Sequence, residues 1–336
     1  MKLADVVGHE RATARLRRVA DAGTVPAAIL FLGPAGIGKR TLAEAFAARL
    51  LCAAPGGGDA CGACAQCTRL AAGTHPDLRL VAREAERRDL RIEQVRELTR
   101  WLALQPLMAA RKVGLVDDAH CLNEHGQNAL LKTLEEPPGA SVLLLVATSA
   151  ALVLPTVRSR CQPIRLEPLP AADVARVLAA KGMPAAAIGD VAALAEGSVG
   201  RALALVAEAD APGRKRLLDA LPRLATVPAS ELSAIAQDLA RGGSETALAA
   251  ALAWYRDVLE VSLVAGAEPR RNPAAAATIR TVAAGGRPAS VLRQLELVCD
   301  TIADLEKNAN RMLSIETMLL ALRETERQRG SGPPRG

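Results

Sequence analysis

Hydrophobic positions follow two different patterns along this chain. Up to about residue 165, short continuous apolar runs alternate with segments whose apolar residues recur at helical spacing. Continuous apolar runs are typical of strands buried on both faces, and their alternation with helices is typical of a parallel sheet covered on both sides. Strands are predicted at 27–32, 78–82, 112–116 and 142–148, and the helices between them include 39–51, 91–104 and 124–135.

After Pro168 the pattern changes to Ala- and Leu-rich amphipathic helices without a clear strand. Helical blocks are predicted to begin near 168 and near 211, where Pro and Gly residues interrupt the pattern. The last residues, QRGSGPPRG at 328–336, have the composition of a disordered tail. The sequence therefore predicts an α/β region followed by all-helical regions.

A glycine-rich string, GPAGIGKRT, follows the first predicted strand and opens the helix 39–51. It matches the phosphate-loop template G-x-x-x-x-G-K-[ST] at every fixed position except the last, where Arg40 replaces the hydroxyl that ligates magnesium. We favour a phosphate-binding loop over a glycine turn without a ligand, and leave open whether nucleotide is bound. The candidate nucleotide-binding residues here are Gly33, Pro34, Ala35, Gly36, Ile37, Gly38, Lys39, Arg40 and Thr41.

Two acids follow the strand 112–116, in the string KVGLVDDAH. Asp117 has the place of a magnesium-organising carboxylate, and Asp118 stands where an active ATPase usually has Glu to orient the attacking water. Because Asp is one methylene shorter, its carboxylate falls short by about 1.5 Å, a displacement that can cost about a hundredfold in rate. The alternative is two solvated acids that cap a helix. The phosphate loop upstream favours the functional interpretation.

Four cysteines lie close together: Cys52, Cys61, Cys64 and Cys67 have the spacing C-x8-C-x2-C-x2-C. In a reducing compartment such a cluster favours a structural Zn²⁺ bound by four thiolates over disulfides. Four thiolates leave no open position for catalysis. We interpret Cys121, Cys161 and Cys299 as small core residues, and His75 as a turn residue or a residue that supports the metal ligands, rather than as a ligand itself.

Composition narrows the choice of partners. Half of the 336 residues are hydrophobic, the net charge is +6, and no apolar run is long enough to span a membrane. The N-terminus lacks the apolar region of a secretory signal, so we expect a cytoplasmic protein. The net charge favours nucleic acid or an acidic partner only weakly. Aromatic residues are too few and scattered to stack bases, so any DNA contact would be made through phosphates.

The string RSRC at 158–161 lies beyond the last predicted strand. An arginine at such an edge can enter a neighbouring molecule's nucleotide site, or it can be an ordinary surface charge. The residues alone do not decide between these alternatives.

Taken together, these strings resemble the delta-prime family of bacterial DNA polymerase III clamp-loader subunits, within the AAA+ superfamily. The resemblance covers nearly the whole chain, and LLKTLEEPP followed by SRC is very specific to clamp-loader subunits. The matching strings are VVGHE at 6–10, GPAGIGKRT, the four cysteines, THPD at 74–77, KVGLVDDAH, NALLKTLEEPP at 128–138, LPTVRSRC at 154–161, GSVGRAL at 197–203 and NANRMLSIETMLLAL at 308–322.

The resemblance implies three domains within a hetero-pentameric ring of gamma/tau and delta subunits that loads the sliding clamp onto primed DNA. It also implies that Arg160 is an arginine finger acting in trans and that Thr148 is the sensor-1 residue. The chain would then belong to a DNA-directed DNA polymerase assembly. The implied division is an AAA+ domain at 1–165 with the zinc module at 52–67, a helical lid at 166–210, a helical collar at 211–327 and the tail at 328–336.

Three departures from the ATP-hydrolysing relatives fall in one site: Arg40, Asp118, and Gly200 where the sensor-2 arginine is expected. Arg201 comes one residue later, about 100° around a helix. We therefore expect weak or absent ATP/ADP binding and negligible ATPase activity. The alternatives are a working gamma/tau-type ATPase, in which Thr41 replaces the missing hydroxyl, and a zinc-dependent DNA-binding module.

Overall fold

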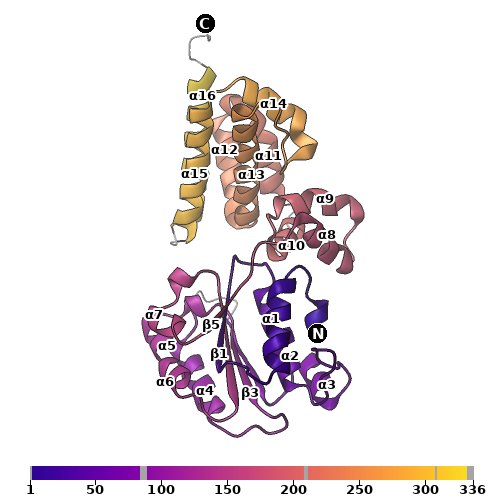
Figure 1. Ribbon diagram of the computed structural model, residues 1–336. Coiled ribbons are helices and arrows are strands. Elements are labelled where there is room, and N and C mark those ends of the chain that lie inside the picture. Colours follow the sequence, from indigo (N-terminus) through magenta and orange to yellow (C-terminus); the bar gives the residue numbers. More distant parts are fainter. Residues whose placement is uncertain (1, 84–88, 208–210, 307–308, 331–336) are drawn as a thin grey trace. The chain divides into compact units, whose positions relative to one another are not determined.

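The computed structural model describes residues 2–83, 89–207, 211–306 and 309–330. The chain forms two compact units, Met1–Asp173 and Val174–Gly336, and each is described here by itself. The first unit contains the sheet and the second is helical (Figure 1). None of the described helices is long and apolar enough to cross a bilayer.

A five-stranded parallel sheet forms the centre of the first unit, with the strand order β2-β3-β4-β1-β5. The predicted parallel sheet is confirmed, and four strands lie within two residues of their predicted bounds. The fifth strand, β5, was not predicted because it is a four-residue edge strand that contains Pro163, and proline is tolerated there because the edge lacks a neighbour. The strands are β1 Ala28–Leu32, β2 Leu78–Val81, β3 Lys112–Val116, β4 Ser141–Ala147 and β5 Gln162–Arg165.

Helices cover both faces of this sheet, because successive strand side chains point to opposite faces. Ile29 and Phe31 of β1 pack in one cluster with α1 and α2, whereas Leu30 and Leu32 pack in a second cluster with α4, α6 and α7. The helices are α1 Glu10–Asp21, α2 Lys39–Leu51, α3 Ala65–Ala71, α4 Ile92–Leu102, α5 Glu124–Asn128, α6 Leu131–Glu135 and α7 Pro155–Arg158. Short 3₁₀ turns are η1 Leu3–Asp5, η2 Ala119–Cys121 and η3 Ala150–Leu152.

The helix predicted at 124–135 is divided into α5 and α6. The N–H of Leu130 bonds to the carbonyl of Gln127, three residues back, which tightens the backbone between the two helices. The Gln127 side chain is buried and bonds to the carbonyls of Leu122 and Leu152 and to the N–H of Leu154. This amide fixes α5 against the chain that leads into α7.

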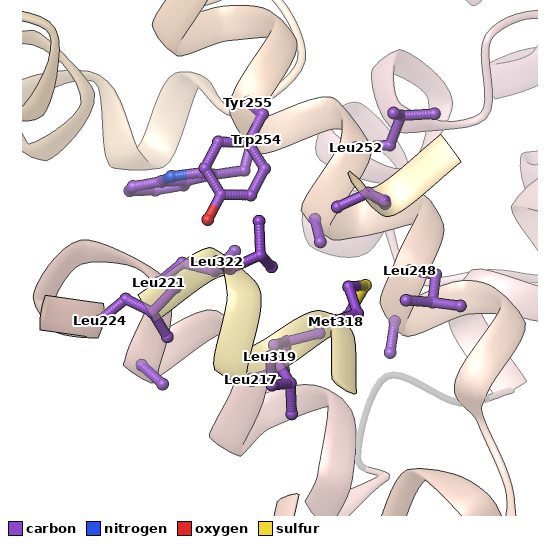
Figure 2. Close-up of a cluster of buried hydrophobic side chains, with 14 of the residues drawn as sticks. Leu217, Leu221, Leu224, Leu248, Leu252, Trp254, Tyr255, Met318, Leu319 and Leu322 are labelled. Carbon is purple, nitrogen blue, oxygen red and sulfur yellow. The ribbon is translucent and has the colours of Figure 1, made fainter. Parts of the chain in front are cut away.

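The second unit is helical throughout its described part, which confirms the predicted change of pattern after Pro168. Its elements are α8 Ala171–Ala180 (which begins in the first unit), α9 Ala185–Leu194, α10 Val199–Ala207, α11 Pro212–Ala220, η4 Leu221–Thr226, α12 Ala229–Arg241, α13 Ser244–Leu263, η5 Pro273–Ala275, α14 Ala276–Ala284, α15 Pro288–Glu306 and α16 Arg311–Gly330. Leucines of α11, α13 and α16 belong to one core that also contains Trp254 and Tyr255 (Figure 2).

The division of the helical part into a lid at 166–210 and a collar at 211–327 stays a prediction. At the C-terminus, α16 continues to Gly330, three residues into the tail predicted at 328–336. The rest of that predicted tail, 331–336, lies outside the described residues.

Candidate functional site

The glycine-rich string connects β1 to α2 at the carboxyl edge of the sheet. At Gly33, φ is 153°, and a Cβ would lie 2.4 Å from the carbonyl oxygen of Leu166, so the position requires glycine. Gly38, at φ 100°, is the N-cap of α2, and the helix begins at Lys39. A loop of this form directs backbone N–H groups and a helix N-terminus at one point, an arrangement suited to phosphate.

The lysine of this loop is buried. Its Nζ donates to the carbonyl oxygen of Pro34 at 2.6 Å. Burial lowers the pKa of Lys39, and the charges of Asp118 and Asp117 partly oppose that shift. From the other side, Nε2 of buried His9 lies 2.7 Å from the carbonyl oxygen of Ile37. His9 stands in the string VVGHE, and no local pattern indicates that it contacts the loop.

The two acids of KVGLVDDAH follow β3 at the same edge. Asp118 has φ 52°, and its N–H donates to Oδ1 of Asp117 at 3.1 Å. Burial and the charge of Asp118 raise the pKa of Asp117, and Arg40 opposes them. Arg83, just beyond β2, donates from Nε to Oδ2 of Asp118 at 3.0 Å. Each acid is therefore paired with an arginine of its own chain.

Arg40 lies between the loop helix and the strand end. Its Nε donates to Oε1 of Glu44 at 2.7 Å, and its NH1 donates to Oδ2 of Asp117 at 3.3 Å. The hydrogen bond to Glu44 is the main reason that the pKa of Arg40 rises. A magnesium ion needs a hydroxyl at position 40 and a free carboxylate at position 117. These residues offer neither, so they do not fit that ion.

Two further candidates flank this region. Thr148 directly follows β4, whose last residue, Ala147, is in register with Leu32 of β1. Thr148 is therefore level with Gly33 at the carboxyl edge. Thr41 lies in the first turn of α2 and is exposed. A step of one residue turns a helical side chain by about 100°, so Thr41 does not occupy the direction of the missing hydroxyl.

The four clustered cysteines meet in space. Their Sγ atoms all lie within 4.8 Å of one another. Cys52 and Cys64 are 3.9 Å apart, and Cys61 and Cys67 are 4.0 Å apart. Four sulfurs at about 2.3 Å from a tetrahedral zinc would be about 3.8 Å apart. The cluster therefore has the dimensions of a four-thiolate metal site.

Backbone N–H groups point at these sulfurs. The N–H of Cys61 donates to Sγ of Cys52, that of Cys64 to Sγ of Cys61, and that of Cys67 to Sγ of Cys64. Hydrogen bonds from the N–H groups of Cys67 and Ala53 lower the pKa of Cys64 to about 6. These backbone donors stabilise the thiolates of Cys61 and Cys64, the form that binds metal, whereas burial raises the pKa of Cys67 to about 12.

Asp59 joins this cysteine module to the N-terminus of the chain. Its carboxylate accepts the N–H groups of Leu3, Ala4 and Ala60, and it pairs with Arg17 at 3.3 Å. Burial alone would raise the pKa of Asp59, but these donors outweigh it and lower the pKa. The 3₁₀ turn at Leu3–Asp5 is therefore fixed to the loop between the first two cysteines.

His75 is outside the sulfur cluster, as expected. Its Nδ1 accepts the N–H of Asp77 at 3.0 Å. Asp77 is fully buried and accepts the N–H groups of Leu107, Met108 and Ala109. The THPD string therefore fixes the loop before β3, a structural role that the sequence pattern did not indicate.

Arg160 is exposed and lies at the amino edge of the sheet, the opposite end of the strands from the phosphate loop. It precedes β5, whose first residue, Gln162, is in register with Ile29 of β1. Gly33 is four residues further along β1, or roughly 13 Å at the rise of a strand. The Arg160 guanidinium lies 2.7 Å from Oε1 of Glu135 and donates to the carbonyl of Thr156 at 3.0 Å. It is therefore distant from the phosphate loop of its own chain.

In the second unit, Arg201 belongs to an ion-pair cluster around Glu196. Its NH1 lies 2.8 Å from Oε2 of Glu196, while Arg256 of α13 lies 2.5 Å from Oε1 of the same carboxylate. Arg271 contacts Glu196 at 3.7 Å and Asp257 at 3.1 Å. Burial would raise the pKa of Glu196, but Arg201 and Arg256 outweigh it and lower the pKa. The cluster ties the start of α10 to α13.

We expect Glu196→Gln to lower the free energy of unfolding at neutral pH by about 1–2 kcal/mol, since it leaves three arginines without their shared carboxylate. Because the folded-state pKa of Glu196 is lowered, its contribution is complete above the ordinary value of 4.5 and is lost as pH falls through the folded pKa. Urea unfolding at pH 7 and pH 3 measures this. Glu268→Gln, at an exposed pair with Arg280, is the control and should change little. An equal loss at both pH values would contradict the account.

Comparison with known proteins finds relatives of this chain. Residues 8–170 match the family model described as DNA polymerase III, delta subunit. The delta-prime subunit of Pseudomonas aeruginosa is 44% identical over 174 residues, covering 51% of this chain and 53% of that protein. The Escherichia coli delta-prime subunit is 36% identical over 195 residues, covering 58% of each. The chain thus spans just over half the length of these relatives.

Two further similarities concern gamma-type proteins. The gamma/tau subunit of Mycobacterium bovis is 38% identical over 167 residues, covering 49% of this chain and 29% of that protein. A solved structure of a gamma-subunit-related protein from Thermotoga maritima covers 94% of this chain and 99% of its own, at 19% identity and a TM-score of 0.43.

The first unit is therefore a parallel α/β domain with a phosphate-type loop and an inserted cysteine cluster, and a helical region follows it. Over about half of its length, the chain is similar to the delta-prime subunits of DNA polymerase III.

Proposed function

We propose that this chain is the delta-prime-type subunit of a DNA polymerase III clamp loader, and that it completes a neighbour's ATP site while its own site is inactive. One observation carries the proposal: Arg160 is exposed and precedes β5, at the end of the sheet away from its own phosphate loop, so it is too distant to act in its own site. In the chain's own site, Arg40 replaces the hydroxyl that binds magnesium, and Asp118 replaces the longer acid that orients the attacking water. The chain therefore supplies a charge to a neighbour and keeps the role of a scaffold.

The arginine's contacts suit this role. Arg160 and Glu135 form an exposed ion pair, which is worth about 0.2–1 kcal/mol. Such a pair orients the guanidinium but is weak enough to be exchanged for a phosphate. On a neighbouring gamma/tau subunit, the planar guanidinium would grip two oxygens of the γ-phosphate and stabilise charge that develops there.

The four cysteines would hold a structural zinc ion in this subunit. The thiolates of Cys52, Cys61, Cys64 and Cys67 fill a tetrahedral shell, so the metal would have no open position for substrate. When bound, zinc would supply folding energy to the module. Because Asp59 accepts hydrogen bonds from the N-terminal turn at Leu3–Asp5, a folded module would also hold that turn in place.

Assembly tests the proposal. The chain, mixed with the delta and gamma/tau subunits of its own organism, should form one hetero-pentameric species whose mass includes a single copy of it. Native mass spectrometry gives both the mass and the composition. Contact with the sliding clamp and primed DNA is then expected through this complex. If the chain stays monomeric beside an assembled gamma/tau–delta complex, the proposed function is wrong.

We expect the isolated chain to show negligible ATPase activity, because Arg40 removes a magnesium ligand and Asp118 shortens the water-orienting arm. Lys39→Ala should leave the small residual rate unchanged, as measured by phosphate release with a purified gamma subunit as the positive control. The competing proposal is a gamma/tau-type ATPase. It would be supported by turnover comparable to that of the gamma subunit, abolished in Lys39→Ala.

A further inference from the structure

In phosphate-loop ATPases a magnesium ion links two parts of the fold. A hydroxyl at the start of the loop helix and a carboxylate at the end of a neighbouring strand both bind it. The ion is the positive charge that holds these elements together while it neutralises phosphates. In this chain, the corresponding positions are 40, at the start of α2, and 117, directly after β3.

Arg40 makes that link with its own side chain. One nitrogen of the guanidinium, NH1, bonds to Asp117, and Nε bonds to Glu44 one turn further along α2. The Arg40–Glu44 bond fixes the direction of the side chain, and a guanidinium stays charged at any pH at which the protein is folded. A permanent cation therefore occupies the connection between α2 and the end of β3.

The charges around this connection balance without a metal. Among the described residues, three cations and three carboxylates meet here: Lys39, Arg40 and Arg83 with Glu44, Asp117 and Asp118. His120 also lies among these groups, and burial lowers its pKa, so it adds no charge at neutral pH. A divalent cation would need the carboxylate of Asp117, which is already paired with Arg40. The site also has no excess negative charge that would attract the cation.

We propose that Arg40 replaces magnesium in this site: it is an internal cation that closes the link between α2 and Asp117 and excludes divalent metal. The inference rests on the proposed inactive site and explains how that site keeps its shape without nucleotide. The exchange of a hydroxyl for arginine is then more than the loss of a ligand. It supplies a substitute for the ion itself.

The test is whether removal of this side chain admits the metal. In Arg40→Thr the hydroxyl is present and Asp117 is free, so binding of a fluorescent ATP analogue should strengthen about tenfold or more when Mg²⁺ replaces EDTA. The wild-type chain should bind the analogue equally weakly, or not at all, in both conditions. Arg49→Thr is the matched control, because Arg49 lies on the same helix and pairs with Asp21 outside the site. It should behave as wild type.

A second measurement follows the metal directly and needs no nucleotide. Mn²⁺ is titrated into the zinc-loaded protein, and the free ion is followed by electron paramagnetic resonance. The wild-type chain should bind no Mn²⁺ at this site. Its titration should therefore contain no binding that becomes stronger in Arg40→Thr or disappears in Asp117→Asn. Wild-type binding of Mn²⁺ that is lost in Asp117→Asn would overturn the proposal. So would an Arg40→Thr chain that is folded but gains no metal-dependent nucleotide binding. Assembly with the gamma/tau and delta subunits, tested separately, distinguishes either failure from failure of the proposed function.

Discussion

The chain, purified under reducing conditions, should contain a single zinc ion, and Cys67→Ser should lose it. The reason is geometric: the paired Sγ distances of 3.9 and 4.0 Å are already those of a tetrahedral thiolate site. Structural zinc binding is worth about 10–16 kcal/mol at neutral pH in small modules. Loss of one thiolate should therefore affect the local fold far more than a typical core substitution. Elemental analysis of the purified protein measures the metal.

Cys299→Ser is the control for this prediction, because Cys299 is a half-buried thiol of the second unit. It should keep its zinc. Since Asp59 joins the module to Leu3 and Ala4, loss of zinc should also speed hydrogen exchange at those two amides. Wild-type protein with well under half an equivalent of zinc would contradict the prediction.

The parts of the site that are local in sequence could be predicted from it. The helix after the glycine loop has the predicted bounds, 39–51, because the loop template fixes where glycine must precede a helix. The four cysteines lie within one short stretch, so their spacing alone indicated that they would meet. The predicted strands were also continuous apolar runs, whose burial on both faces leaves a strong signal.

Contacts between distant segments left no comparable signal. The pairing of Arg83 with Asp118 joins the ends of two strands, and arginine is so common here that no pattern marks this one. His9 reaches the phosphate loop across 28 residues. The Glu196 cluster unites side chains up to 75 residues apart. In each case the tertiary fold, and not the local sequence, determines which residues are in contact.

The departure at position 40 illustrates the same limit. The sequence indicated that a magnesium ligand was missing, because the template fixes that position. It did not indicate that the arginine would bond to Asp117, since 77 residues separate them. The missing magnesium ligand could be predicted from the sequence. That the Arg40 guanidinium takes the place of the ion is visible only in the fold, where the sheet brings β3 beside α2.

Arg160→Ala should leave folding and ring assembly intact but lower the DNA-stimulated ATPase of the reconstituted complex. A dedicated arginine finger contributes about 10³–10⁵ in rate at the site it enters. Only the site beside this subunit would lose that contribution, so the total loss should be partial. Arg160→Lys should not restore the full rate, because an ammonium lacks the planar fork that grips two oxygens.

Arg158→Ala is the matched control. Arg158 is an exposed arginine at the end of α7, two residues before Arg160, and it donates to the carbonyl of Ala150. Its loss should leave the rate unchanged. A general effect of lost surface charge would reduce both variants equally, whereas a finger in trans predicts a loss in Arg160→Ala alone.

The most direct test of the account is therefore the rate of ATP hydrolysis and clamp loading by a complex in which only Arg160 is replaced, with assembly verified by native mass spectrometry. We expect a partial fall in both rates in Arg160→Ala and wild-type rates in Arg158→Ala. Unchanged rates in an assembled Arg160→Ala complex would contradict the central claim that this chain lends its arginine to a neighbour's site.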